Sequence, residues 1–236
     1  MRILVLGASS MIGSCLAAEF APGNTLLLAG RNGKKLAVAA ERCRAAGAVE
    51  AACVEQDLAQ GTGEIRLRLA DAPVDLLIDA ASASSRQRDG ELRAAQLAPF
   101  AMADFTSKVE LVDWLLTRQP RAPGIVFIST VLVKLMSPER LAYSSLKRLH
   151  GLYLEKAAAE HPDMNLLVVH VGSVLATDRT TPKHGRLAAA ARRAYEQGRR
   201  EISLGTSGRL FAALFQISPL AFLAVARLRR RLSRSG

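Results

Sequence analysis

The stretch Gly7-Ala8-Ser9-Ser10-Met11-Ile12-Gly13 decides the fold, because it joins the apolar run Arg2–Leu6 to the helical pattern Met11–Phe20. A glycine-containing turn between a strand and a helix is the context in which a dinucleotide pyrophosphate binds. Gly7 permits a tight turn, and Gly13 permits close packing of the helix on the sheet. The stretch therefore predicts a nucleotide site, and an ordinary strand–turn–helix is the alternative.

The other positions of this loop set its phosphate chemistry. The amino terminus of the helix and the hydroxyls of Ser9 and Ser10 can hold phosphate oxygens. We expect Met11 and Ile12 to contact the cofactor as well. Met11 occupies a place where glycine is often found, so the approach of the backbone to the phosphate is altered there.

Apolar, strand-like runs alternate with helical patterns along most of the chain. The predicted strands are Arg2–Leu6, Thr25–Ala29, Val49–Val54, Val74–Ile78, Gly124–Ser129 and Leu166–Val171. The predicted helices are Met11–Phe20, Lys34–Ala46, a short Glu64–Ala70, a long Leu92–Arg118 and Leu141–Glu160. Strands that are apolar on both faces and separated by helices imply an α/β fold, a doubly wound parallel sheet of the Rossmann type.

Charge and hydropathy divide the chain into two parts. The 236 residues carry a net charge of +11, and residues 186–236, with eleven arginines and two glutamates, hold +9 of it. We expect residues 1–185 to form one dinucleotide-binding and catalytic domain. We expect residues 186–236 to form a substrate lid or a helical extension that is apolar and basic.

The function of this extension has two interpretations. Leu187–Gln197 is helical in pattern, Glu201–Leu204 is extended, and Leu210–Ala226 is apolar. The apolar run is short for a membrane span. It can lie in a membrane interface with its arginines at the headgroups, or it can cover the substrate pocket or a subunit interface. Few aromatic residues accompany the arginines, so we expect no nucleic-acid partner.

The compartment follows from the cysteines and the amino terminus. Cys15, Cys43 and Cys53 are odd in number and lack metal-ligand spacing, so we expect buried thiols and no metal. The amino terminus lacks the apolar core and cleavage site of a signal peptide. These features predict a cytoplasmic protein, peripheral at the inner face of the membrane if the extension binds lipid.

Tyr143 and Lys147 are the candidate catalytic pair. Side chains four residues apart on a helix project from one face. An ammonium beside a phenol favours the phenolate and lowers the pKa of the tyrosine, which creates a proton donor and acceptor for a hydroxyl/carbonyl pair. The alternative is an ordinary pair of helix residues.

The end of the second predicted strand indicates which dinucleotide binds. No acid stands there to bind a ribose diol; Arg31 can instead pair with an adenosine 2′-phosphate, with Asn32 or Lys34 nearby. This favours NADP, and a solvated arginine is the alternative. Asp57-Leu58 follows the third strand, where the carboxylate can accept from the adenine amino group or cap a turn.

These motifs resemble the short-chain dehydrogenase/reductase family in order and spacing from Met1 to about Thr177. The resemblance implies transfer of hydride from NADPH to a ketone, with Tyr143 as general acid/base. It implies that Lys147 bonds the nicotinamide ribose. Thr130 stands 13 residues before Tyr143, in the place of the family's serine, and would orient the carbonyl.

The chain departs from the family in three places, which makes it a divergent member. Asp79-Ala80-Ala81-Ser82 replaces Asn-Asn-Ala-Gly, so Ala80 and Ala81 are the implied cofactor contacts there. Gln96 takes the place of a helix asparagine in the proton relay. Val171-Gly172 replaces Pro-Gly. Beyond it, the resemblance implies that Val174 contacts the carboxamide and that Thr177 contacts the pyrophosphate or the amide.

The substrate and the activity leave alternatives open. The loop, the strand-two Gly-Arg-Asn and the arginine-rich tail are similar to a branch of ketoreductases that act on polyprenyl-phosphate sugars. We expect a small-molecule substrate, hydrophobic or lipid-linked. The alternatives are a nucleotide-binding partner or regulatory protein without catalysis, and an isomerase or dehydratase. The family resemblance implies a homodimer or tetramer formed through the two long helices.

Overall fold

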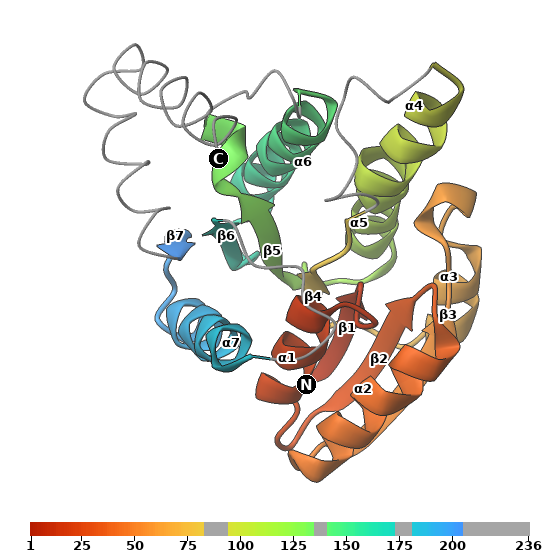
Figure 1. Ribbon diagram of the computed structural model, residues 1–236, viewed down its shortest axis with the longest axis vertical. Helices are drawn as coiled ribbons and strands as arrows, with labels where there is room; N and C mark the ends of the chain where they lie inside the picture. Colours follow the sequence, from red (N-terminus) through yellow and green to blue (C-terminus); the bar gives the residue numbers. More distant parts are fainter. Residues whose placement is uncertain (83–93, 135–140, 173–180, 205–236) are drawn as a thin grey trace, which may run out of the picture.

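The computed structural model describes residues 1–82, 94–134, 141–172 and 181–204 (Figure 1). Its centre is a seven-stranded sheet in the order β3-β2-β1-β4-β5-β6-β7, with every pairing parallel. The strands are β1 Arg2–Leu6, β2 Thr25–Gly30, β3 Glu50–Glu55, β4 Leu76–Asp79, β5 Gly124–Thr130, β6 Leu166–Val171 and β7 Glu201–Leu204. The predicted α/β fold with a doubly wound parallel sheet is confirmed.

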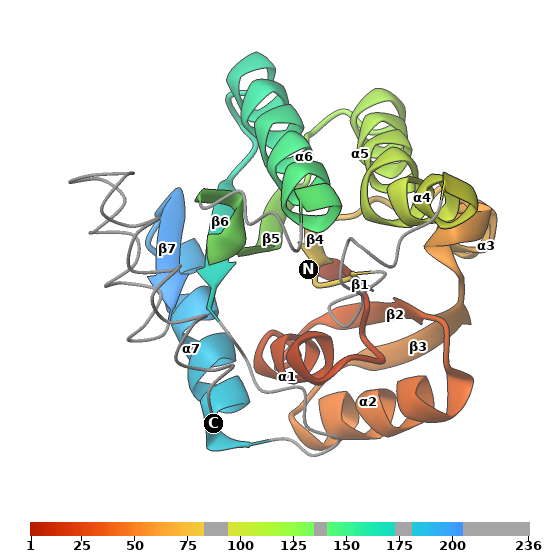
Figure 2. The same ribbon diagram turned by 45° about the horizontal axis from the view of Figure 1, so that its top comes forward.

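Helices cover both faces of this sheet (Figure 2). One face carries α1 (Met11–Glu19), α2 (Gly33–Ala45) and α7 (Pro182–Glu196). The other carries α3 (Gly63–Leu69), α4 (Ala94–Ala101), α5 (Ser107–Arg118) and α6 (Leu141–Glu160). Short turns of 3₁₀-helix occupy Leu58–Gln60 and Val131–Lys134.

Alternation along the strands produces two separate cores. On β1, Ile3 and Val5 face the α1 side, whereas Leu4 and Leu6 face the α5 side, and all four are buried. Because each strand in the middle of the sheet is buried on both faces, its sequence is a continuous apolar run. This pattern made the strands predictable.

Two helices differ from the expected ones. The predicted helix Leu92–Arg118 is interrupted by a π-helical turn at Met102–Thr106, which separates α4 from α5. The helix expected at Leu187–Gln197 begins earlier, at Pro182. The Thr181 amide donates to His184 Nδ1 at 3.1 Å, and proline suits the first helical position because it lacks an N–H. The boundary expected at residue 186 thus falls inside α7, which packs on α1.

The expectation of buried cysteines holds only in part. Cys43 is buried, and that burial raises the pKa of its thiol to about 11. Cys15 is half-buried, whereas Cys53 is exposed because it lies on the edge strand β3. Among the described residues, no helix is long and apolar enough to cross a membrane. Leu210–Ala226 lies outside those residues.

Candidate active site

The order of the strands reverses between β1 and β4, so the chain diverges there and leaves a crevice at their carboxyl ends. Gly7 follows β1, and Ala80 and Ala81 follow β4. Gly7 has φ +76°, and a Cβ on it would lie 2.7 Å from the nitrogen and the Cα of Ala81. Only glycine at position 7 allows the two loops to lie this close together. The loops thus form a cradle that can accept a phosphate group.

The start of α1 is built equally tightly. Ser10 is the N-cap, and its hydroxyl accepts from the Gly13 amide at 3.0 Å. A Cβ on Gly13 would lie 2.2 Å from the Gly7 carbonyl oxygen, and one on Gly30 would lie 2.6 Å from Ser9 Oγ. The helix amino terminus is therefore held against the crevice, where it favours an anion.

A cavity of about 760 Å³ lies along this edge of the sheet. It brings together nine of the predicted cofactor contacts: Gly7, Ser9, Ser10, Arg31, Asn32, Asp57, Leu58, Ala80 and Ala81. Met11, Ile12 and Gly13 lie in the first turn of α1, next to the lining residues. The structure thus gathers at one cavity predicted contacts that lie up to 74 positions apart in the chain, from Gly7 to Ala81.

The far end of the cavity is basic. Arg31, Asn32 and Lys35 line it and are exposed; Asn32 was one of the two expected neighbours of Arg31, and Lys35 lines the cavity where Lys34 was the other. The side chain of Asn32 accepts from the Lys35 amide at 2.9 Å and so caps α2. Asp57 caps the turn that follows it, with Oδ1 accepting from the Ala59 amide at 3.0 Å.

The proposed catalytic residues lie at the ends of β5 and α6. Lys147 is buried, and its Nζ donates to the Ala81 carbonyl at 3.0 Å and to the Ile128 carbonyl at 3.2 Å. Tyr143 lies one turn earlier on α6 and is half-buried. Thr130 ends β5 and is buried, and its Oγ1 accepts from the Leu132 amide at 3.2 Å.

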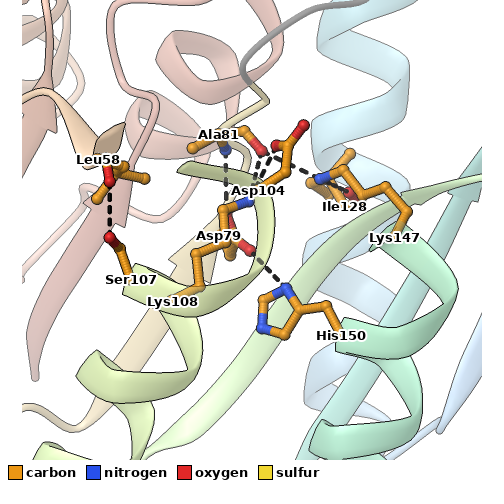
Figure 3. Close-up of polar contacts among 9 residues, drawn as sticks. All are labelled: Leu58, Asp79, Ala81, Asp104, Ser107, Lys108, Ile128, Lys147 and His150. Carbon is orange, nitrogen blue, oxygen red and sulfur yellow. Dashed lines mark hydrogen bonds and ion pairs between the residues drawn. The ribbon is translucent and has the colours of Figure 1, made fainter. Parts of the chain in front are cut away.

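A buried ionic cluster lies beside Lys147 (Figure 3). Lys108 Nζ lies 3.0 Å from Asp79 Oδ1 and 3.8 Å from Asp104 Oδ1, and it donates to the Ala81 carbonyl at 2.7 Å. Asp79 Oδ1 also accepts from the Ala81 amide at 3.1 Å. The amide and the carbonyl of Ala81 are thus both hydrogen-bonded to buried charged side chains.

The charges in this cluster perturb one another. Burial alone would raise the pKa of the Asp79 carboxyl, but the Lys108 and Lys147 ammoniums outweigh it, and the pKa lies below its usual value. Burial also lowers the pKa of His150 to about 3, so its imidazole is neutral near pH 7. His150 Nδ1 lies 3.5 Å from Asp79 Oδ2. Because this imidazole is neutral, the positive charge that balances Asp79 comes from lysine.

Sequence reasoning noticed Asp79 only as a departure and missed Asp104, Lys108 and His150. A usable signal was present: an aspartate and a lysine four residues apart, Asp104 and Lys108, within a helix expected to pack on the sheet. The side chain of Gln96 and residues Val174 and Thr177 lie outside what the structure describes. Within the described part of the chain, no three histidine, cysteine or acidic side chains are grouped to hold a metal.

Known proteins with similar sequences and folds are oxidoreductases. The model of the short chain dehydrogenase family matches residues 1–186. An uncharacterised oxidoreductase of Mycobacterium tuberculosis strain H37Rv is 28% identical over 215 residues, which cover 85% of this chain and 86% of the relative.

Solved structures agree with this fold. A short-chain dehydrogenase from Sphingobium yanoikuyae in complex with NADPH has a TM-score of 0.76 at 20% identity, covering 93% of this chain and 94% of that one. A 3-oxoacyl (acyl-carrier-protein) reductase from Agrobacterium tumefaciens with NADP bound has a TM-score of 0.73 at 22% identity, covering 86% and 92%.

Proposed function

This chain belongs to the short-chain dehydrogenase/reductase family of NAD(P)-dependent oxidoreductases, and from that premise we propose that it interconverts a ketone and a secondary alcohol with NADP as cofactor. The observation that carries the proposal is the placement of Lys147. It is buried at the carboxyl edge of the sheet, and its ammonium donates to Ala81, a residue that lines the nucleotide cavity. Tyr143 precedes it by one turn on the same helix.

The cavity fits a dinucleotide. Its glycine cradle has no room for a Cβ at Gly7, and Ser9, Ser10 and the start of α1 offer hydroxyls and amides for a pyrophosphate. Arg31 and Lys35 at the far end offer two cations for an adenosine 2′-phosphate. When bound, NADPH would supply the hydride.

The roles of the other residues follow from their chemistry. Tyr143 donates a proton to the oxygen of the carbonyl as that oxygen gains negative charge. Lys147 favours the phenolate that remains, because its charge is held in a buried site where electrostatic interactions are strong. The hydroxyl of Thr130 hydrogen-bonds the carbonyl oxygen and orients it. Gln96 retains the proposed part in proton relay, and Val174 and Thr177 retain theirs in cofactor contact.

The substrate is a small molecule with a ketone or secondary alcohol. The proposal of a hydrophobic or lipid-linked substrate, and of the membrane surface as a partner, depends on residues 205–236, which lie outside the described residues. Oligomerisation through the α5 and α6 faces likewise stays a prediction.

The first test is titration of the purified protein with NADPH and with NADH, followed by nucleotide fluorescence. We expect Arg31→Ala to weaken NADPH binding about 10-fold or more, because a charge-assisted bond to the 2′-phosphate is worth roughly 1.5–3 kcal/mol. NADH binding should stay within about twofold, which controls for damage to the loop.

The second test separates the enzyme from a non-catalytic binder. Tyr143→Phe should retain NADPH binding and lose at least about 100-fold in turnover of a panel of ketones, because general acid catalysis contributes roughly that much. Turnover that survives this substitution would remove Tyr143 from the mechanism. A protein that binds NADPH and reduces no ketone of the panel would favour the regulatory alternative.

A further inference from the structure

We infer that Lys108 is a positioning residue for the proposed reaction: by neutralising Asp79 and sharing the Ala81 carbonyl, it keeps Lys147 on its two carbonyl partners and so sets the ionisation of Tyr143. This inference rests on the proposed function of Tyr143 and Lys147. It concerns a residue on α5 that is not among the residues lining the cavity.

Among the side chains that the structure describes, the buried cluster pairs two acids with two lysines. Two carboxylates, Asp79 and Asp104, face two ammoniums, Lys108 and Lys147, and each of these side chains is at least 98% buried. His150 adds no charge, because its imidazole is neutral. A buried charge is costly unless it is paired, so the loss of one member leaves a net charge that its neighbours must absorb.

Lys108 and Lys147 have different partners within this cluster. Both donate to the Ala81 carbonyl oxygen, at 2.7 Å and 3.0 Å, so the two ammoniums lie close together although they repel. Lys108 is the one within ion-pair distance of Asp79, at 3.0 Å. Among the described residues, Lys147 has no carboxylate within ion-pair distance and bonds only carbonyls.

Without Lys108, Lys147 would be the cation that remains near Asp79 among the residues that the structure describes. The Asp79 carboxylate already binds the amide of Ala81, the residue whose carbonyl Lys147 bonds. Lys147 would therefore move toward Asp79. Its ammonium would then stabilise the Asp79 carboxylate instead of the phenolate of Tyr143. Lys108 on α5 thus leaves the ammonium of Lys147 on α6 available to stabilise the phenolate of Tyr143.

Three variants of the cluster give it three different net charges. Lys108→Met leaves the cluster with a net negative charge, which disfavours the Tyr143 phenolate. Asp79→Asn leaves a net positive charge, which favours it. Asp79→Asn/Lys108→Met removes one charge of each sign, so the net charge of the cluster equals that of the wild type.

The experiment is a titration of phenolate absorbance that needs neither substrate nor cofactor. The chain has three tyrosines, and burial raises the pKa of both Tyr153 and Tyr195 above the usual value of a tyrosine. Subtracting the Tyr143→Phe protein in each background isolates Tyr143. We expect its pKa to rise by roughly one unit in Lys108→Met and to fall by roughly one unit in Asp79→Asn. In the double variant it should return to within about a third of a unit of the wild type.

A Tyr143 pKa that is the same in all four backgrounds would overturn the inference and leave Lys108 with a purely structural role. If Lys108→Met fails to fold, the comparison of Asp79→Asn with the double variant still isolates Lys108, and equal values in those two would overturn it. Absence of ketone reduction would defeat the proposed function but not these shifts, so the two failures are distinguishable.

Discussion

Replacement of Gly13 by alanine tests whether the nucleotide loop depends on the close approach seen in the structure. A Cβ at this position would lie 2.2 Å from the Gly7 carbonyl oxygen and 2.8 Å from its carbonyl carbon, where ordinary contact begins at 3.4 Å. Both neighbours are backbone atoms of a turn that is itself pressed against Ala81. The start of α1 must therefore move away from β1.

This movement should lower the free energy of unfolding by an amount that can be estimated. Because the Cβ would meet backbone atoms, overpacking here should cost the upper part of the usual 1–3 kcal/mol range, roughly 2–3 kcal/mol, and the higher helix propensity of alanine offsets about 1 kcal/mol of it. We expect Gly13→Ala to lower the free energy of unfolding by about 1–2 kcal/mol. The displaced amides should also lose phosphate contacts, so we expect NADPH affinity to fall about 10-fold or more.

Urea unfolding followed by circular dichroism measures the first effect, and nucleotide fluorescence measures the second. Gly63→Ala is the matched control, because Gly63 begins α3 and no atom lies within 4 Å of its ideal Cβ. That variant should be as stable as the wild type or up to about 1 kcal/mol more stable. If Gly13→Ala behaved like Gly63→Ala in both measurements, the reasoning from close approach would be refuted.

Two other sites give independent predictions. His150 has a pKa of about 3 in the fold against 6.5 when unfolded, so only the unfolded chain gains this proton between those values. Stability should therefore fall as pH drops from 6.5 toward 3, by up to about 1.4 kcal/mol per unit, and His150→Leu should flatten this slope in urea unfolding at several pH values. Ser107 is buried and its Oγ donates to the Leu58 carbonyl at 2.6 Å, so Ser107→Ala should cost about 1–2 kcal/mol of unfolding free energy, whereas Thr117→Ala on the exposed side of α5 should cost under about 0.5 kcal/mol.

The sheet was predictable because its central strands are buried on both faces. Six strands were expected close to their observed bounds, and the extended Glu201–Leu204 proved to be β7, a seventh strand of the same sheet. The interruption of the long helix left only a weak signal in the sequence. Pro99 lies inside α4, three residues before the π turn, and a proline in a helix interior favours a local break, but no proline or glycine stands within Met102–Thr106 itself.

The candidate site divides in the same way. The glycine loop and Arg31, which line the cavity, could be singled out because loop and strand-end chemistry is local in sequence. The partners of Asp79 were not, since Lys108 and His150 come from two helices that only the packed fold brings to β4. Two adjacent lysines, Lys34 and Lys35, follow Arg31 closely, and only the folded structure shows that Lys35 is the one among the residues that line the cavity.

Ala81 is the residue through which the two halves of the site are joined. Its nitrogen and Cα press against Gly7, its amide is held by Asp79, and its carbonyl is held by Lys108 and Lys147. A phosphate seated at the Gly7 loop would therefore bear on the same backbone that positions the proposed catalytic lysine. Since the carboxylate of Asp79 replaces a neutral amide side chain of the family pattern, this backbone requires a lysine from α5 as counter-charge. Nucleotide affinity and the ionisation of Tyr143 should accordingly change together when Asp79 or Lys108 is altered, although neither side chain lines the cavity.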